Sequence, residues 1–220
     1  MFRWLRGSSD GLAEVEEAFK EMLADGRRVF DLAFDARLGE AAPESIKSEL
    51  EATEERTDEA ERRIRRLLLT HASVQGGANI SACLLYMSVA KDAERVADLS
   101  KNVFGIADTV GTQPHSELFD ELARLRAEVS PMITDAARIF AEERTEEAER
   151  FLERARGLQG DCRRRIDDLL LERVAVPQPA ATAMTYRQLS RVLANLLNIV
   201  SAVVMPLDQL DYPHRAPGEE

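Results

Sequence analysis

The sequence predicts an all-α protein built from two tandem three-helix bundles. Aromatic residues make up only 5% of the 220 residues, and glycine and proline are scarce, at 11 and 8 residues. Ala, Leu, Glu and Arg recur throughout, which is the composition of long helices rather than of strands. Helix-breaking residues divide the chain into six long segments that form two matching triplets. A hydrophobic content of 45% is enough to bury a sizeable core.

The first triplet is defined by apolar side chains at three- and four-residue spacing, interrupted by glycine and proline. Pro43 occupies a favoured first-turn position. The run Ile80–Val89 is apolar on nearly all sides, which predicts a central buried helix. The expected segments run from about Gly11 to Arg37, from Pro43 to the Gly76-Gly77 pair, and from Asn79 or Ser81 to about Ala107.

The second triplet follows the breaks at Gly111 and Pro114. Pro131 falls inside its first helix, where the missing N–H predicts a kink. Its expected segments are Leu118 to Glu143, Thr145 to about Arg173, and Ala180 to about Val204. We therefore expect one repeat over 8–110, a second over 112–206, and an extended tail over 207–220.

Charge and cysteine usage exclude several classes of function. The net charge of −11 would repel a nucleic-acid backbone. Cys83 and Cys162 lack a CxxC spacing, which fits a reducing compartment and neither a zinc site nor a disulfide framework. The chain has no run of eighteen apolar residues, and Met1–Gly7 is too short for the apolar region of a signal peptide. We expect a cytoplasmic protein, with a packed or frayed N-terminus favoured over membrane contact.

Catalytic motifs are weak. No Glu-x-x-His pair of a di-iron bundle and no phosphate-cradling loop is present. We interpret Cys83 as a packing residue, His71 as a helix-end cap, and Tyr86 and Tyr186 as core or boundary residues. The sequence therefore gives little support to catalytic chemistry.

Two acidic pairs at i, i+4 spacing are candidates for a metal site. They are Glu54 with Asp58 and Glu94 with Asp98. Carboxylates four residues apart project from one helix face, and clustered oxygen ligands suit hard metal ions. Composition alone predicts roughly seven such pairs by chance. Spacing alone therefore favours a solvated face with salt bridges to Arg56, Arg62 or Arg95 over a metal site.

Residues 91–103 closely resemble the signature of the PhoU family, in which Glu-Arg-x-x-Asp precedes an Asn on the third helix of a bundle. Glu94, Arg95, Asp98 and Asn102 fall on this pattern. On the preceding helix, the matching residues are Glu54, Asp58 and Ile64. The resemblance implies two tandem three-helix bundles and iron or another hard divalent or trivalent ion bound on surface carboxylates.

The second repeat departs from the signature at the positions that would bind metal. Arg191 and Asn198 are kept, but the carboxylates are replaced. The residues equivalent to Glu54, Asp58, Glu94 and Asp98 are Arg156, Gly160, Ser190 and Ala194. If metal binds as the resemblance implies, it binds in the first repeat only.

The resemblance also implies a function. PhoU-family members regulate phosphate transport and the phosphate-starvation response through contact with the cytoplasmic ATPase component of a phosphate transporter and with a sensor histidine kinase. The resemblance therefore implies a protein that is not an enzyme and does not turn over phosphate esters or nucleotides. A metal-binding accessory bundle and a purely structural interaction bundle, both unrelated to phosphate control, remain open as alternatives. A homodimer is compatible with the acidic surface, because helical bundles can bury an apolar face between protomers.

Overall fold

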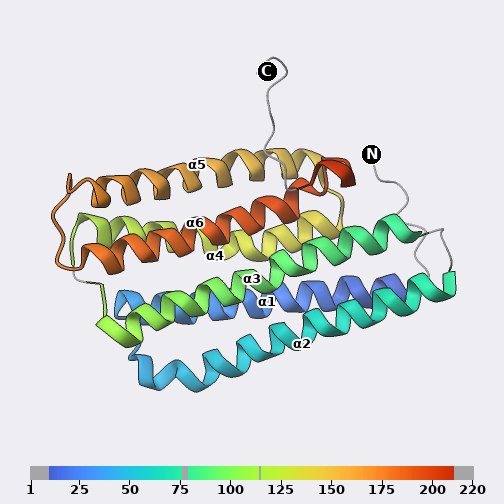
Figure 1. Ribbon diagram of the computed structural model, residues 1–220, viewed down its shortest axis with the longest axis horizontal. Helices are drawn as coiled ribbons and strands as arrows, with labels where there is room; N and C mark the ends of the chain where they lie inside the picture. Colours follow the sequence, from blue (N-terminus) through green and yellow to red (C-terminus); the bar gives the residue numbers. More distant parts are fainter. Residues whose placement is uncertain (1–9, 76–78, 114, 211–220) are drawn as a thin grey trace, which may run out of the picture.

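The computed structural model describes residues 10–75, 79–113 and 115–210, and these form six long helices with no strand in those ranges (Figure 1). The predicted all-α class is confirmed. The calls on Met1–Gly7, Gly76-Gly77, Pro114 and the tail beyond Leu210 lie outside the described residues. The helices are α1 (Asp10–Leu38), α2 (Pro43–Gln75), α3 (Ile80–Val110), α4 (Glu117–Ala141), α5 (Thr145–Leu170) and α6 (Pro179–Ser201).

The helix ends follow local chemistry. Pro43 and Pro179 begin α2 and α6, where a missing N–H costs no helical hydrogen bond. Gly39 after α1 and Gly111 after α3 have φ values of 79° and 81°, a region that glycine enters without strain. Ser116 caps α4 by accepting a hydrogen bond from the backbone N–H of Phe119 at 3.2 Å.

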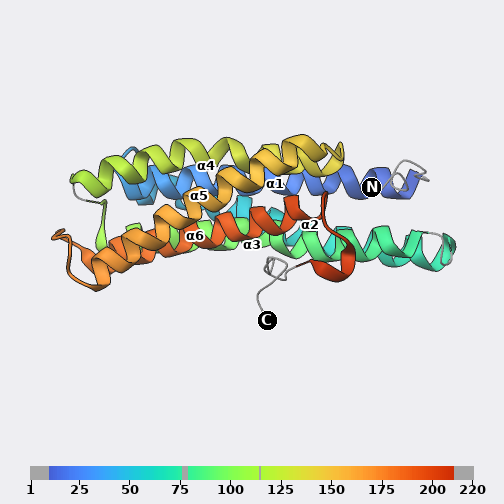
Figure 2. The same cartoon turned by 90° about the horizontal axis from the view of Figure 1, so that it is seen from above.

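The two triplets share one continuous hydrophobic core. α3 and α6 lie side by side and run in opposite directions, with α1 and α4 on the other side of the molecule (Figures 1 and 2). α4 packs mainly against α1 rather than against α5 or α6. The amide of Asn198 on α6 donates to Asp92 on α3 at 3.1 Å. The repeats are therefore joined through two helix pairs, α3 with α6 and α1 with α4.

Arginine side chains reinforce the seam between α1 and α4. Arg126 on α4 lies 2.6 Å from Asp35 and 3.6 Å from Asp31, both on α1. Arg27 donates to Ser130, directly before Pro131, and to Thr134, three residues after it. Helix α4 continues through this proline.

One end of the seam is filled by aromatic rings. Phe19 on α1 and Phe140 on α4 have ring centroids 5.2 Å apart, and Tyr86 on α3 lies 6.0 and 5.3 Å from them. Tyr186 is fully buried and donates from its hydroxyl to the carbonyl of Leu118. Both tyrosines are core residues, as the sequence predicted.

The opposite end is held by a buried arginine. Arg37, in the last turn of α1, is 0% exposed. Its guanidinium donates to Thr185 at 3.2 Å, to the carbonyl of Gly111 at 2.9 Å, and to the side-chain oxygens of Gln113 and Gln178. All of these acceptors are neutral, and burial lowers the pKa of Arg37 to about 10. Arg37 thus connects α1, the linker between the repeats, and α6.

We expect Arg37→Met to lower the free energy of unfolding by about 2–4 kcal/mol, because the buried acceptors lose their donor while the aliphatic volume is mostly kept. Chemical denaturation of the two proteins measures this difference. Arg95→Met, at an exposed position on α3, is the control and should change stability by less than about 0.5 kcal/mol. Equal stability of Arg37→Met and wild type would show that the cluster does not hold the seam.

Candidate functional site

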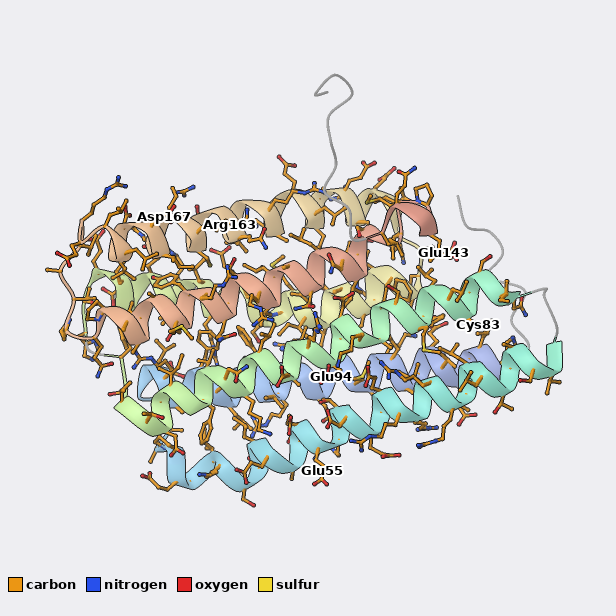
Figure 3. All side chains as sticks on the ribbon, in the orientation of Figure 1. Glu55, Cys83, Glu94, Glu143, Arg163 and Asp167 are labelled. Atoms are coloured by element: carbon orange, nitrogen blue, oxygen red, sulfur yellow. The ribbon has the colours of Figure 1, made fainter. Side chains whose placement is uncertain are left out.

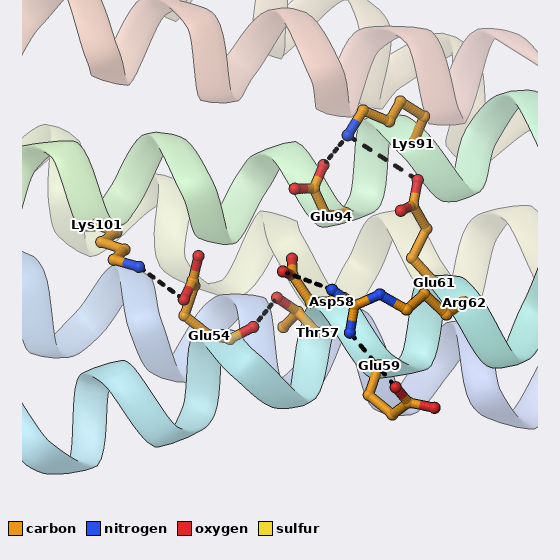
Figure 4. Close-up of polar contacts among 9 residues, drawn as sticks. All are labelled: Glu54, Thr57, Asp58, Glu59, Glu61, Arg62, Lys91, Glu94 and Lys101. Atoms are coloured by element: carbon orange, nitrogen blue, oxygen red, sulfur yellow. Dashed lines mark hydrogen bonds and ion pairs between the residues drawn. The ribbon is translucent and has the colours of Figure 1, made fainter.

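The candidate carboxylates lie on two neighbouring helices of the first bundle. Glu54 and Asp58 are one turn apart on α2, and Glu94 and Asp98 are one turn apart on α3. The two helices pack against each other and run in opposite directions. Figure 4 shows Glu54, Asp58 and Glu94 along the α2–α3 boundary. We refer to these four residues as the carboxylate face.

Two carboxylates of this face are paired with lysines. Nζ of Lys101 lies 2.8 Å from Glu54, and Nζ of Lys91 lies 2.7 Å from Glu94 (Figure 4). The side chains of Glu54 and Glu94 are only 16% and 13% exposed. Lys91 also lies 4.0 Å from Glu61, a third acidic residue of α2 on this side. Each buried carboxylate therefore has a cation within contact distance.

Of the three arginines that the sequence offered as salt-bridge partners of the face, Arg56, Arg62 and Arg95, only one forms an ion pair with it among the described residues. Arg62 lies 3.5 Å from Asp58 on its own helix. Arg56 instead binds Asp25 on α1 at 2.7 Å. Arg95 and Asp98 are exposed, and neither forms an ion pair within the described part of the chain. Lysine ammonium groups thus neutralise Glu54 and Glu94, the two mostly buried carboxylates of the face, whereas Asp98 stays accessible to solvent.

Crowding of negative charge alters protonation on this face. Burial is the main cause that raises the pKa of Glu94, and the charges of Glu61 and Asp98 add to it, whereas Lys91 opposes the rise. The hydrogen bond with Glu54 raises the pKa of Lys101. The lysines therefore offset a repulsion that the carboxylates would otherwise feel.

The face offers hard oxygen donors but no preformed metal cage. Among residues 10–75, 79–113 and 115–210, no group of three or more His, Cys, Asp or Glu side chains is arranged to hold a metal ion. An incoming cation would have to displace Lys91 or Lys101 from the carboxylates that they contact. The metal site remains a prediction.

The equivalent positions of the second repeat have different chemistry. Arg156 and Gly160 lie on α5, and Ser190 and Ala194 lie on α6. Ser190 is buried, and its backbone carbonyl accepts a hydrogen bond from Gln159 at 3.2 Å. These four positions carry no carboxylate. These four side chains therefore supply none of the carboxylate oxygens that the proposed cation site of the first repeat would use.

The other singled-out residues have structural contacts. Cys83 is 6% exposed, in agreement with its interpretation as a packing residue, and burial raises the pKa of its thiol. Nε2 of His71 lies 3.2 Å from Nδ2 of Asn79. His71 therefore helps to join the end of α2 to the start of α3.

We expect the carboxyl group of Glu94 to titrate above the ordinary glutamate value of about 4.3. Because the folded state then binds the proton more tightly than the unfolded state, the wild type should gain stability relative to Glu94→Gln as the pH falls through this range. Carboxyl carbon NMR measures the midpoint, and denaturation of both proteins between about pH 7 and 4.5 measures the stability difference. A titration midpoint at or below the ordinary glutamate pKa would show that burial and the neighbouring carboxylates do not raise the pKa of Glu94.

Comparison with known proteins tests the family resemblance. Residues 19–107 match the family model described as the PhoU domain. This span covers most of α1, all of α2 and most of α3, and it includes the whole carboxylate face. The search of curated proteins finds no match. None of the described helices is both long and apolar enough to cross a membrane. The match confirms the resemblance seen in residues 54–64 and 91–103: the chain carries a PhoU domain in its first three helices.

Proposed function

We propose that this protein is a cytoplasmic adaptor that regulates phosphate transport and phosphate-starvation signalling through protein contacts. The PhoU domain belongs to a family of phosphate-homeostasis regulators that are not enzymes. This domain match carries the proposal. The proposed partners are the cytoplasmic ATPase component of a phosphate transporter and a sensor histidine kinase.

The exposure of the signature residues supports a role in contact. Arg95, Asp98 and Asn102 on α3 are all exposed, whereas the valines beside them, Val96 and Val103, are fully buried. The valines account for the packing of this helix. The polar residues between them are free to meet another protein.

The thiols argue against nucleophilic chemistry. Cys83 and Cys162 are buried, and burial raises the pKa of both. A reactive cysteine requires the opposite, an accessible thiol with a lowered pKa. Both residues are therefore suited to packing, which supports a regulator that acts by binding.

We also propose that a hard cation such as iron binds at the carboxylate face of the first repeat only. Oxygen ligands would come from Glu54, Asp58, Glu94 and Asp98, with water completing the shell. The lysine contacts support a second candidate. In that candidate, Lys91 and Lys101 neutralise the face permanently, and the protein is a structural interaction bundle without metal.

We expect the purified protein to bind the transporter ATPase or the sensor kinase from its own host. Pull-down followed by calorimetry with the purified partner measures the affinity. Glu51→Gln, an exposed change on α2 that keeps the signature, is the control for Asp98→Asn/Asn102→Asp. The signature variant should bind at least about fivefold more weakly, equivalent to about 1 kcal/mol. Absence of binding to both partners by the wild type would contradict the adaptor role.

The metal proposal predicts that iron, manganese or magnesium raises the Tm of the wild type but not that of Glu94→Ala/Asp98→Ala. Lys91→Met/Lys101→Met should show a larger metal-induced rise than the wild type, since no ammonium group then competes for the carboxylates. Thermal unfolding with and without each ion measures all three proteins. Equal shifts in the wild type and the Glu94→Ala/Asp98→Ala variant, or no shift in any of the three proteins, would contradict the site. A shift in Lys91→Met/Lys101→Met alone would favour lysine neutralisation in the wild type.

A further inference from the structure

The second repeat carries a cationic surface where the first repeat carries its carboxylate face. The same alignment of the two repeats places Arg163 at the position of Glu61, a further acidic residue beside the four candidate positions. Lys91 and Arg95 correspond to Arg187 and Arg191, so both cations are kept. All four acidic residues of the carboxylate face, and Glu61 beside it, are thus lost in the second repeat, where arginine replaces Glu54 and Glu61. We call Arg156, Arg163, Arg187 and Arg191 the arginine face.

The structure brings these four arginines to one boundary. α5 and α6 are packed and antiparallel, and Gln159 on α5 contacts Ser190 on α6 at 3.2 Å. Arg156 and Arg163 lie about one turn to either side of Gln159, and Arg187 and Arg191 flank Ser190. Figure 3 shows Arg163 on the α5 side of the molecule and Glu94 on the α2 side.

The arginines of this face have no carboxylate partner within the described part of the chain. All four are exposed. Arg163 donates to the side chain of Gln159, a neutral group. Other arginines of α5 are paired: Arg154 with Glu128, Arg164 with Asp161, and Arg165 with Glu121. In a chain of net charge −11, these four arginines without an ion-pair partner form a local cationic cluster, which is bounded on α5 by Glu153 and Asp167, one turn beyond Arg156 and Arg163.

The dimensions of the face favour a ligand with several separated negative charges. Arg156 and Arg163 are seven residues apart, which is about 10 Å along a helix. A single small oxyanion would neutralise only part of the four charges, which are spread over two helices. A short segment with acidic residues on successive turns matches the spacing.

The acidic net charge of the protein favours a short acidic segment over an extended polyanion as the ligand of the arginine face. Exposed charges are screened beyond about 8 Å at physiological ionic strength, so a short acidic segment responds mainly to the local arginines. DNA or an anionic membrane extends past the face and meets the acidic remainder of the surface. We infer that the arginine face is a docking surface for a short acidic segment of a protein partner. This inference rests on the proposed adaptor function and names the surface through which it acts.

The direct test uses the full chain labelled with ¹⁵N and a synthetic helical peptide that carries glutamate on successive turns. Amide shifts should concentrate in 156–163 of α5 and 187–194 of α6. Raising the salt concentration from about 0.05 M to 0.3 M should weaken binding several-fold. The same peptide with glutamine in place of glutamate should not bind.

Matched variants test the arginines themselves. Arg156→Gln/Arg163→Gln should weaken peptide binding at least about tenfold, or about 1.4 kcal/mol. Arg124→Gln/Arg150→Gln is the control, since both residues are exposed, form no ion pair among the described residues and lie outside the face. It removes the same charge and should change binding by less than about twofold.

Three results would overturn the inference: equal binding by the two variants, amide shifts on another surface, or binding to anionic lipid vesicles but not to the peptide. The adaptor function is judged separately, by binding of the transporter ATPase or the kinase to the wild type. If a partner binds equally to wild type and Arg156→Gln/Arg163→Gln, the adaptor role stands and the arginine face is wrong. If the peptide binds as expected but neither partner does, the face stands and the partners are wrong.

Discussion

The buried guanidinium of Arg37 is the contact on which the relation of the two repeats depends. Its charge is solvated by backbone and side-chain dipoles from Gly111, Gln113, Gln178 and Thr185, with no carboxylate in the set. A guanidinium presents its donors in a fixed plane, so these acceptors have to hold defined positions. Because they belong to the linker and to α6, satisfying Arg37 also sets where the second repeat begins. The cost of burying the charge is offset only when every donor is satisfied.

This arrangement determines which surfaces remain for binding. Helix α6 packs against α3, and α4 packs against α1, where Arg126 pairs with Asp35. These four helices are therefore engaged in the contact between the two repeats. The outer boundaries, α2 with α3 and α5 with α6, are left at opposite flanks of the molecule (Figure 1). Burial raises the pKa of Asp35 while Arg126 opposes that rise, so this ion pair lies at least partly out of water. The carboxylate face and the arginine face therefore lie on different flanks of one packed core.

Much of this fold could be predicted from the sequence, because apolar periodicity and helix breakers are local signals. The signature residues on α3 were identified by the resemblance of one contiguous stretch, residues 91–103, to a family motif, and the Lys91–Glu94 pair has a local spacing of three. The contacts that decide the arrangement are not local: Arg37 and Thr185 are 148 residues apart, and Lys101 and Glu54 are 47 apart. No spacing rule marks such partners. Their contacts also explain why four carboxylates predicted as metal ligands are found partly neutralised by lysine.

The repeats show why fold and surface chemistry can diverge within one chain. Val96 and Val192 are equivalent, as are Val103 and Ile199, and all four side chains are fully buried. Their loss would leave cavities in the core, so packing limits what these positions accept. Exposed equivalents carry no such limit, since a surface substitution away from special contacts changes stability by less than about 0.5 kcal/mol. An acidic residue such as Glu54 can therefore correspond to Arg156 without loss of the bundle. The same backbone can present a cation-binding surface on one flank and an anion-binding surface on the other.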